Sequence, residues 1–291
     1  MNRFKEKLYK TFFLGNAFIV VLILAGIFIL LIKNSLPAFS KISVGEFLLG
    51  PVWNPGGYDE SSFGILPIII STLMVTIGAM LFSVPLGILT AAYIAEVASP
   101  REKEIIKPVI EVLAGIPSVV VGFFGIVVLG PWIAQIFNLS NGLNAINGSI
   151  LLGIMSLPTI ISLAEDAITA VPDDYRQASL ALGAGKWTTL VRVVIPAALS
   201  GITAAVMLGM GRAIGETMTV LMATGNAPAM PKSFLGSVRT MTATVAIELG
   251  EVPFNTTHFY VLFAVGLVLF IMTFLVNLAS DMILQRYQEV E

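Results

Sequence analysis

Long runs of apolar residues without any charge dominate the chain. The first, Thr11 to Ile32, lies between Lys10 and Lys33. As a helix it would be about 33 Å long, and the hydrocarbon core of a bilayer is about 30 Å thick. A secretory signal peptide has an apolar stretch of only about 7–15 residues. We therefore interpret this segment as a retained membrane span.

Five further apolar segments have the length of membrane spans. Charges, Gly130-Pro131 and the polar stretch from Asn138 to Asn144 divide them. They are predicted at about Ile68 to Ile94, Pro108 to Leu129, Ile146 to Ala164, Pro196 to Met222 and His258 to Ile283. An even number of spans places both termini on one side of the membrane.

Composition supports this pattern. The sequence is 56% hydrophobic and 12% charged, against about 25% charged in soluble proteins, which excludes a soluble enzyme with a charged surface. A net charge of −2 provides no basic field for nucleic acid. With no cysteine and one histidine, His258, the chain cannot form a thiolate or multi-histidine metal site. We predict an all-α polytopic membrane protein that itself binds no cofactor.

Lysine and arginine positions predict the orientation. One side carries most of them: Arg3, Lys5, Lys7, Lys10, Arg101, Lys103, Lys107, Arg176, Lys186, Arg192 and Arg286. The other carries Lys33, Lys41, Lys232 and Arg239. The positive-inside rule then puts both termini in the cytoplasm. We expect residues 1–65 to hold a cytoplasmic tail, the first span and an external loop, residues 66–283 to form the transmembrane domain, and residues 284–291 to form a second tail.

The cytoplasmic segment 165–196 has a local structure of its own. Pro172-Asp173-Asp174 is typical of a helix start, and Gly183 suits the end of a short helix over Tyr175 to Leu182. A second short helix, Lys186 to Val194, is predicted to stop at Pro196. The small residues Ala178, Ser179 and Ala181 would let the first helix enter a groove of another protein. The alternative is a loop that only links two spans.

The residue spacing in this segment resembles a known sequence signature. Gln177-Ala178-Ser179, three residues, Gly183, nine residues and Val193-Val-Ile-Pro196 resemble the "EAA" signature of binding-protein-dependent ABC importer permeases. That signature reads Glu-Ala-Ala, three residues, Gly, nine residues, Ile-x-Leu-Pro, so this chain departs at positions 177, 179, 193 and 195. The resemblance implies a six-span type I importer fold and a coupling helix that docks on an ATPase.

ATP hydrolysis would require a separate chain. A phosphate-binding loop needs Gly-Lys followed by Ser or Thr, and the nearest candidate, Gly183-Ala-Gly-Lys186, is followed by Trp187. ATP and Mg²⁺ would then be bound by that partner ATPase.

Two charges lie inside the predicted fifth span. Arg212 and Glu216 are four residues apart, which in a continuous helix places both on one face. Each costs about 2.5–3.5 kcal/mol at the bilayer centre. One interpretation is a structural ion pair that joins helices. The other is an anion path, in which the guanidinium attracts an oxyanion and Glu216 holds the arginine.

A second resemblance bears on the choice between a structural ion pair and an anion path. The segment Arg212-Ala-Ile-Gly-Glu-Thr-Met-Thr-Val-Leu-Met222, followed by Gly225-Asn226, resembles the phosphate-specific (Pst) branch of these permeases, as does Ser237 to Glu248. The continuation after Thr217 is similar to the PstC type. The resemblance implies a phosphate importer of the bacterial or archaeal inner membrane. Its arginine and glutamate map onto Arg212 and Glu216, and we group Thr217 with them as substrate path.

The resemblance also implies partners. These are a second, PstA-like permease, two copies of an ATPase and an external phosphate-binding protein. Weaker site candidates are Arg239 and Glu248 in the outer loop, which would line the external mouth or contact the binding protein, with solvated loop charges as the alternative. Trp53, Tyr58 and His258 are predicted to be interfacial residues.

Other functions remain as alternatives. A permease for another oxyanion would share the loop motif. An ion-coupled secondary transporter would need no ATPase, and an intramembrane enzyme would need a nucleophile–base pair that the sequence does not offer. The leading hypothesis is an ATP-driven importer subunit for inorganic phosphate.

Overall fold

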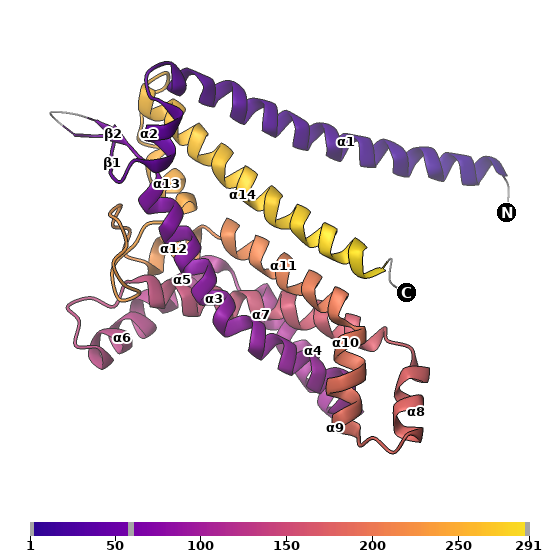
Figure 1. Ribbon diagram of the computed structural model, residues 1–291. Helices are drawn as coiled ribbons and strands as arrows, with labels where there is room; N and C mark the ends of the chain where they lie inside the picture. Colours follow the sequence, from indigo (N-terminus) through magenta and orange to yellow (C-terminus); the bar gives the residue numbers. More distant parts are fainter. Residues whose placement is uncertain (1–2, 58–60, 289–291) are drawn as a thin grey trace.

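The computed structural model describes residues 3–57 and 61–288. Tyr58 lies outside these described residues. Helices form nearly all of the described structure (Figure 1). The long helices are α1 (Arg3–Ser35), α3 (Leu66–Ala92), α7 (Ala145–Thr169), α11 (Leu199–Gly215) and α14 (Thr257–Gln288). The prediction of an all-α polytopic membrane protein is confirmed. Within the described residues, five helical runs are long and apolar enough to span a membrane: Tyr9–Ser40, Leu66–Val97, Ser118–Ile136, Ala145–Thr169 and Thr257–Ala279. The bent pair Lys186–Ala197 and Leu199–Gly215, counted as one span, gives a sixth.

Shorter helices connect the long ones. They are α2 (Val44–Leu49), α4 (Pro100–Gly115), α5 (Ser118–Phe124), α6 (Gly130–Ile136), α8 (Asp173–Ala181), α9 (Lys186–Thr189), α10 (Ile195–Ala197), α12 (Met218–Ala223) and α13 (Met241–Glu248). A 3₁₀ turn, η1 (Leu36–Ser40), follows α1. Three π-helical segments, η2 (Tyr93–Val97), η3 (Gly125–Leu129) and η4 (Leu190–Val194), interrupt the longer helical runs. Strands β1 (Trp53–Asn54) and β2 (Ser62–Phe63) form an antiparallel hairpin.

The two chain ends lie at the same end of the bundle (Figure 1). α8 and α9 project near that end, whereas α2, α13 and the β1–β2 hairpin gather at the opposite end. This arrangement agrees with six spans. The cytoplasmic orientation of the termini stays a prediction, since it rests on the charge distribution alone.

The third span begins later than the sequence predicts. Instead of Pro108 to Leu129, it runs over Ser118–Ile136. α4 is a separate amphipathic helix that starts at a capping box between Ser99 and Glu102. It ends where Pro117 forces Ile116 into an extended conformation, at φ −67° and ψ 124°. The proline, rather than the last charge, sets the boundary.

The fifth span is broken in two places. The Lys186–Ala197 and Leu199–Gly215 helices meet at an angle of 69°, and α11 then ends at Gly215, where Glu216 adopts ψ 132°. Pro196 does not end the preceding helix as predicted, because it occupies an initial position of α10 that needs no amide hydrogen. The prediction of one continuous helix from Pro196 to Met222 is wrong.

Glycines let the central helices approach closely. A Cβ atom added at Gly87 of α3 or at Gly209 of α11 would lie 2.7 Å from a side-chain carbon of Ile160 on α7. Ala205 of α11 is fully buried. Small residues on α3 and α11 thus bring these two helices close to α7 around Ile160.

Candidate functional site

Arg212 is in the last turn of α11, on the exposed side of the isolated chain. Its Nη1 donates a hydrogen bond to Oγ1 of Thr159 on α7, at 3.0 Å. Among the residues that the structure describes, it forms no ion pair. The guanidinium is therefore held by a neutral hydroxyl and keeps donors free for another acceptor.

Glu216 does not share a helix face with Arg212. Since α11 ends at Gly215, Glu216 begins the break before α12. Its carboxylate accepts a hydrogen bond from the amide of Thr219 at 3.3 Å, and its carbonyl accepts one from Thr242 at 2.8 Å. The expected helical i,i+4 pairing is wrong, and the carboxylate instead satisfies an amide in the first turn of α12.

Thr217 completes this break. It precedes α12 and its hydroxyl lies 3.4 Å from the carbonyl oxygen of Gly215. Arg212, Glu216 and Thr217 thus share one short stretch of chain that contains the end of one helix and the beginning of the next. A helix break exposes backbone polar groups, which inside a membrane occurs only next to protein or a water-filled cavity.

Arg239 and Glu248 are not solvated loop charges. Nη1 of Arg239 lies 2.7 Å from Oε1 of Glu248, and their side chains are only 16% and 13% exposed. Trp53 Nε1 donates to the same carboxylate oxygen at 3.0 Å, while His258 Nε2 lies 2.7 Å from the other oxygen. These four residues form the outer cluster, in which the carboxylate has a partner on each oxygen.

The outer cluster also corrects two interfacial assignments. Trp53 is 3% exposed and packs edge-on against His258, so neither is a free interfacial side chain. Burial is the largest influence on the Glu248 carboxyl and favours its neutral form. The hydrogen bonds from His258 and Trp53 and the charges of His258 and Arg239 outweigh burial and lower the pKa of Glu248 below its ordinary value.

The helix predicted within segment 165–196 is present as α8. It follows Pro172, and Gly183 adopts the left-handed conformation at φ +84° after its end, as predicted. None of the α8 residues is buried. Gln177 and Ala178 are exposed, whereas Ser179 is half-buried and its hydroxyl lies 2.9 Å from that of Thr189 on α9.

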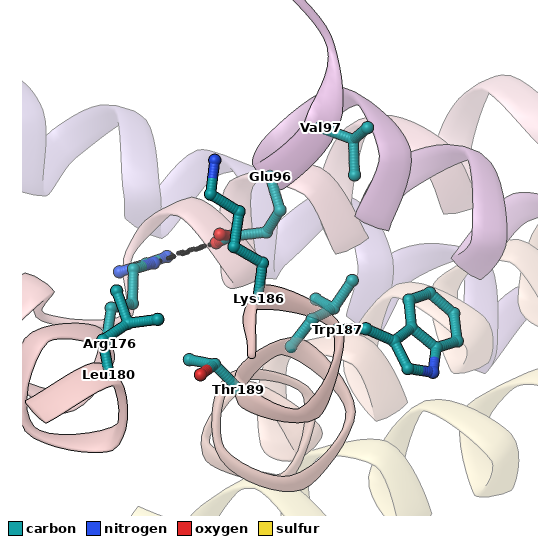
Figure 2. Close-up of a pocket in the computed structure, with 8 residues that line it drawn as sticks. Glu96, Val97, Arg176, Leu180, Lys186, Trp187 and Thr189 are labelled. Atoms are coloured by element: carbon teal, nitrogen blue, oxygen red, sulfur yellow. Dashed lines mark hydrogen bonds and ion pairs between the residues drawn. The ribbon is translucent and has the colours of Figure 1, made fainter. Parts of the chain in front are cut away.

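A pocket of about 430 Å³ lies between α8, α9 and the end of α3. Its lining includes Leu180, Lys186 and Trp187 together with Glu96 and Arg176 (Figure 2). Leu182, just beyond α8, is 90% exposed and Trp187 is 70% exposed. This end of the molecule therefore presents large apolar side chains outside the bundle, which is typical of a protein contact surface.

Sequence reasoning missed four residues that the structure adds to these sites. Thr159, Glu96 and Arg176 were not singled out as partners, and Trp53 was assigned to an interface. Each contact joins positions that are far apart in the sequence: 53 residues for Thr159 and Arg212, 80 for Glu96 and Arg176, and 195 for Trp53 and Glu248. No local spacing could have indicated them.

Comparison with known proteins identifies the family. Residues 83–289 match the family described as binding-protein-dependent transport system inner membrane component. The chain is 41% identical over 234 residues to the probable ABC transporter permease protein YqgH of Bacillus subtilis (strain 168), covering 80% of this chain and 75% of that protein. It is 33% identical over 289 residues to the phosphate transport system permease protein PstC of Mesorhizobium japonicum, covering 93% and 87%.

Solved structures show the same fold at lower identity. A chain of a bacterial ABC transporter involved in the import of the acidic polysaccharide alginate aligns with a TM-score of 0.62 at 15% identity, covering 98% of this chain and 99% of that one. A chain of the inward-facing MetNI methionine ABC transporter aligns with a TM-score of 0.59 at 19% identity, covering 77% and 95%.

These findings confirm the type I importer permease fold and decide against an ion-coupled secondary transporter. The family match begins within α3 and includes α8, the broken fifth span and α14. The chain belongs to the binding-protein-dependent ABC importer family as a multi-pass permease subunit, similar in sequence to PstC phosphate permeases.

Proposed function

We propose that this chain, together with a second, PstA-like permease, forms the translocation path for inorganic phosphate in an ATP-driven importer. Two ATPase subunits bind ATP and Mg²⁺, and an external phosphate-binding protein delivers the substrate. The assembly lies in the cytoplasmic membrane of a bacterium or archaeon, with both termini of this chain in the cytoplasm. Similarity to phosphate transport system permease proteins supports the choice of substrate.

The single observation that carries the proposal is the environment of Arg212. Its side chain is exposed in the isolated chain although it belongs to a membrane span, and Thr159 is its one side-chain partner among the described residues. A charge facing lipid is costly, so a second permease or a water-filled path has to cover this surface. A guanidinium there binds a tetrahedral oxyanion through two parallel hydrogen bonds.

Residues near Arg212 complete the proposed path. Glu216 and Thr217 contribute the polar atoms of the helix break, four and five residues farther along the chain. At the outer end of the bundle, Arg239 and Glu248 neutralise each other. We assign this pair to the structure of the external mouth rather than to direct attraction of phosphate.

The cytoplasmic residues couple the path to ATP hydrolysis. Gln177, Ala178 and Ser179 lie on α8, Gly183 ends it, and Pro196 lies in α10 immediately before the bend into α11. ATP binding draws the two ATPases together, and α8 follows the ATPase on which it is docked. The movement reaches α11 through α9 and α10, so that Arg212 is exposed alternately to each side.

Phosphate uptake into proteoliposomes that contain the complete importer tests the path. Arg212→Gln should abolish ATP-dependent uptake of radiolabelled phosphate, and Arg212→Lys should restore part of it because the charge remains. Arg192→Gln, an exposed arginine of the cytoplasmic segment, is the matched control. Full uptake by Arg212→Gln would exclude the proposed role. ATP-dependent uptake of radiolabelled sulfate or molybdate by the unmodified importer, with no uptake of phosphate, would exclude phosphate as the substrate.

Co-purification of the ATPase tests the coupling assignment. Leu182→Asp places a charge at the most exposed apolar position near α8 and should reduce the amount of ATPase that purifies with the permease pair. Leu49→Asp is the control, because Leu49 is 70% exposed at the opposite end of the bundle. Equal ATPase recovery with both variants would contradict docking through α8.

A further inference from the structure

Arg176 joins three helical elements through one guanidinium. Its Nη2 and Nε lie 2.6 Å and 2.9 Å from Oε1 of Glu96, and Glu96 belongs to η2 at the end of α3. Nη2 also donates to the carbonyl of Ile168 at 3.0 Å, and Nη1 donates to the carbonyl of Val171. Asp173 on the first turn of α8 accepts a further bond from Nη1 at 3.2 Å.

These contacts add side-chain donors to backbone carbonyls at the end of α7 and in the turn after it. The carbonyl of Ile168 also accepts the backbone amides of Ala170 and Val171, so the guanidinium is an additional partner there. The side chains of Arg176 and Glu96 are 17% and 20% exposed, so water only partly screens their attraction. Figure 2 shows the two groups facing each other on one wall of the pocket.

α8 has few other attachments to the transmembrane bundle. It has no buried residue, and the hydroxyl contact of Ser179 joins it only to Thr189 of α9. The pocket next to it leaves space between α8 and the end of α3. Within the described residues, Arg176 is therefore the one side chain of α8 that forms hydrogen bonds to α3 and to the end of α7.

Glu96, which accepts the hydrogen bonds of Arg176, lies in a segment that is not regular α-helix. Glu96 is part of a π-helical stretch, Tyr93–Val97, and such stretches are frequent at functional sites. A second π-helical stretch, η4, contributes Leu190 to the same pocket. The pair thus connects the proposed docking helix to a part of α3 whose backbone is not regular α-helix.

We infer that the Arg176–Glu96 ion pair is a positioning link that transmits movement of α8 to α3 and α7, in parallel with the covalent route through α9 and α10 to α11. The inference rests on the proposed docking of α8 on the ATPase. α3 and α7 pack on each other through Gly87 and Gly153, so a displacement passed to either helix moves both. Without the link, α8 would follow the ATPase while α3 and α7 lagged behind.

The test measures transport for each ATP hydrolysed in the complete importer. Glu96→Gln and Arg176→Gln should each lower phosphate uptake per ATP by about fivefold or more, the lower end of typical couplings between distant sites, while ATPase recovery stays near that of the unmodified complex. Because both variants remove the same interaction, the double variant should be no worse than Arg176→Gln alone. Glu104→Gln and Arg101→Gln, which change exposed charges on α4, should leave the ratio unchanged.

Two results would overturn the inference. One is an unchanged ratio of uptake to hydrolysis in Glu96→Gln and Arg176→Gln. The other is a lower yield of assembled complex with normal uptake per complex, which identifies a purely structural pair. If Leu182→Asp leaves ATPase recovery unchanged while Glu96→Gln lowers phosphate uptake per ATP, docking through α8 is rejected instead. The two proposals are therefore contradicted by different measurements.

Discussion

Trp53 donates its indole hydrogen to the same Glu248 oxygen that pairs with Arg239, at 3.0 Å and 2.7 Å. The contact between Trp53 and Glu248 joins β1 of the hairpin to the C-terminal end of α13. His258, at the start of α14, binds the other carboxylate oxygen. One carboxylate thus fixes three segments at the outer end of the bundle.

Removing this carboxylate should destabilise the protein. In Glu248→Ala, Nη1 of Arg239 and the indole nitrogen of Trp53 lose their acceptor while both side chains stay largely buried, and Nε of Arg239 keeps the carbonyl of Asn226. Breaking a buried pair costs about 3–5 kcal/mol, and the residual exposure of both side chains reduces that figure. Thermal unfolding in detergent checks the loss. Glu251→Ala, an exposed neighbour, should unfold at nearly the original temperature, and an equal midpoint for both variants would contradict the role of the cluster.

Acid should weaken the same cluster. The pKa of Glu248 lies below its ordinary value of 4.5 in the folded protein. A carboxyl with a lowered folded pKa stabilises the fold fully above its ordinary pKa, and the stabilisation is lost as the pH falls through the folded value. The difference in unfolding temperature between the unmodified chain and Glu248→Gln should therefore shrink as the pH falls below 4.5. A difference that stays constant down to that range would show that Glu248 ionisation does not contribute.

Thr159 should affect transport through Arg212. Its hydroxyl is the one side-chain acceptor for the guanidinium among the described residues, and a single hydrogen bond contributes about 0.5–1.5 kcal/mol. Thr159→Val should thus reduce phosphate uptake about two- to tenfold, whereas Thr159→Ser should retain it because the hydroxyl remains. Equal uptake by the two variants would show that the hydroxyl does not orient Arg212.

The close packing of α3 and α11 against Ile160 predicts that added methyl groups destabilise the protein and that a smaller residue at position 160 restores stability. Gly87→Ala and Gly209→Ala each place a methyl group 2.7 Å from an Ile160 carbon, and overpacking of this kind costs about 1–3 kcal/mol. A smaller residue in Ile160→Ala should restore part of the stability in either double variant. Gly15→Ala, where no atom lies within 4 Å of the added carbon, is the control, and thermal unfolding is again the measurement.

The sequence predicted the parts of this fold that depend on hydrophobic length and on single residues. The uncharged runs located the second, fourth and sixth spans to within five residues at each end. Gly183 marked the end of α8 at the position where a left-handed conformation is required. The third span was displaced because charge was given more weight than Pro117. A charge-free run shows where a helix crosses the membrane only when no proline divides it.

The candidate site was predicted less completely than the fold. Arg212 and Glu216 were found as charges in an apolar segment, but their relation was wrong, since i,i+4 geometry assumes a continuous helix and the chain breaks at Glu216. The burial and mutual pairing of Arg239 and Glu248 were underestimated, because hydrophobicity does not show that a polar loop folds back into a buried cluster. Contacts across many residues are set by packing, which no local pattern contains.

The 69° bend at Ala198 has a mechanical consequence. The helical arm before the bend is about 18 Å long, and Arg212 lies about 21 Å beyond the bend, at 1.5 Å per residue. We take the two arms as one rigid body that rotates about the bend. A displacement of about 3 Å at the end near Lys186, which is about the length of one hydrogen bond, then moves Arg212 by about 3–4 Å. The direction of that swing is turned by the bend. A displacement applied at the end of the bundle that carries α8 and α9 therefore becomes a displacement of a guanidinium within the fifth span.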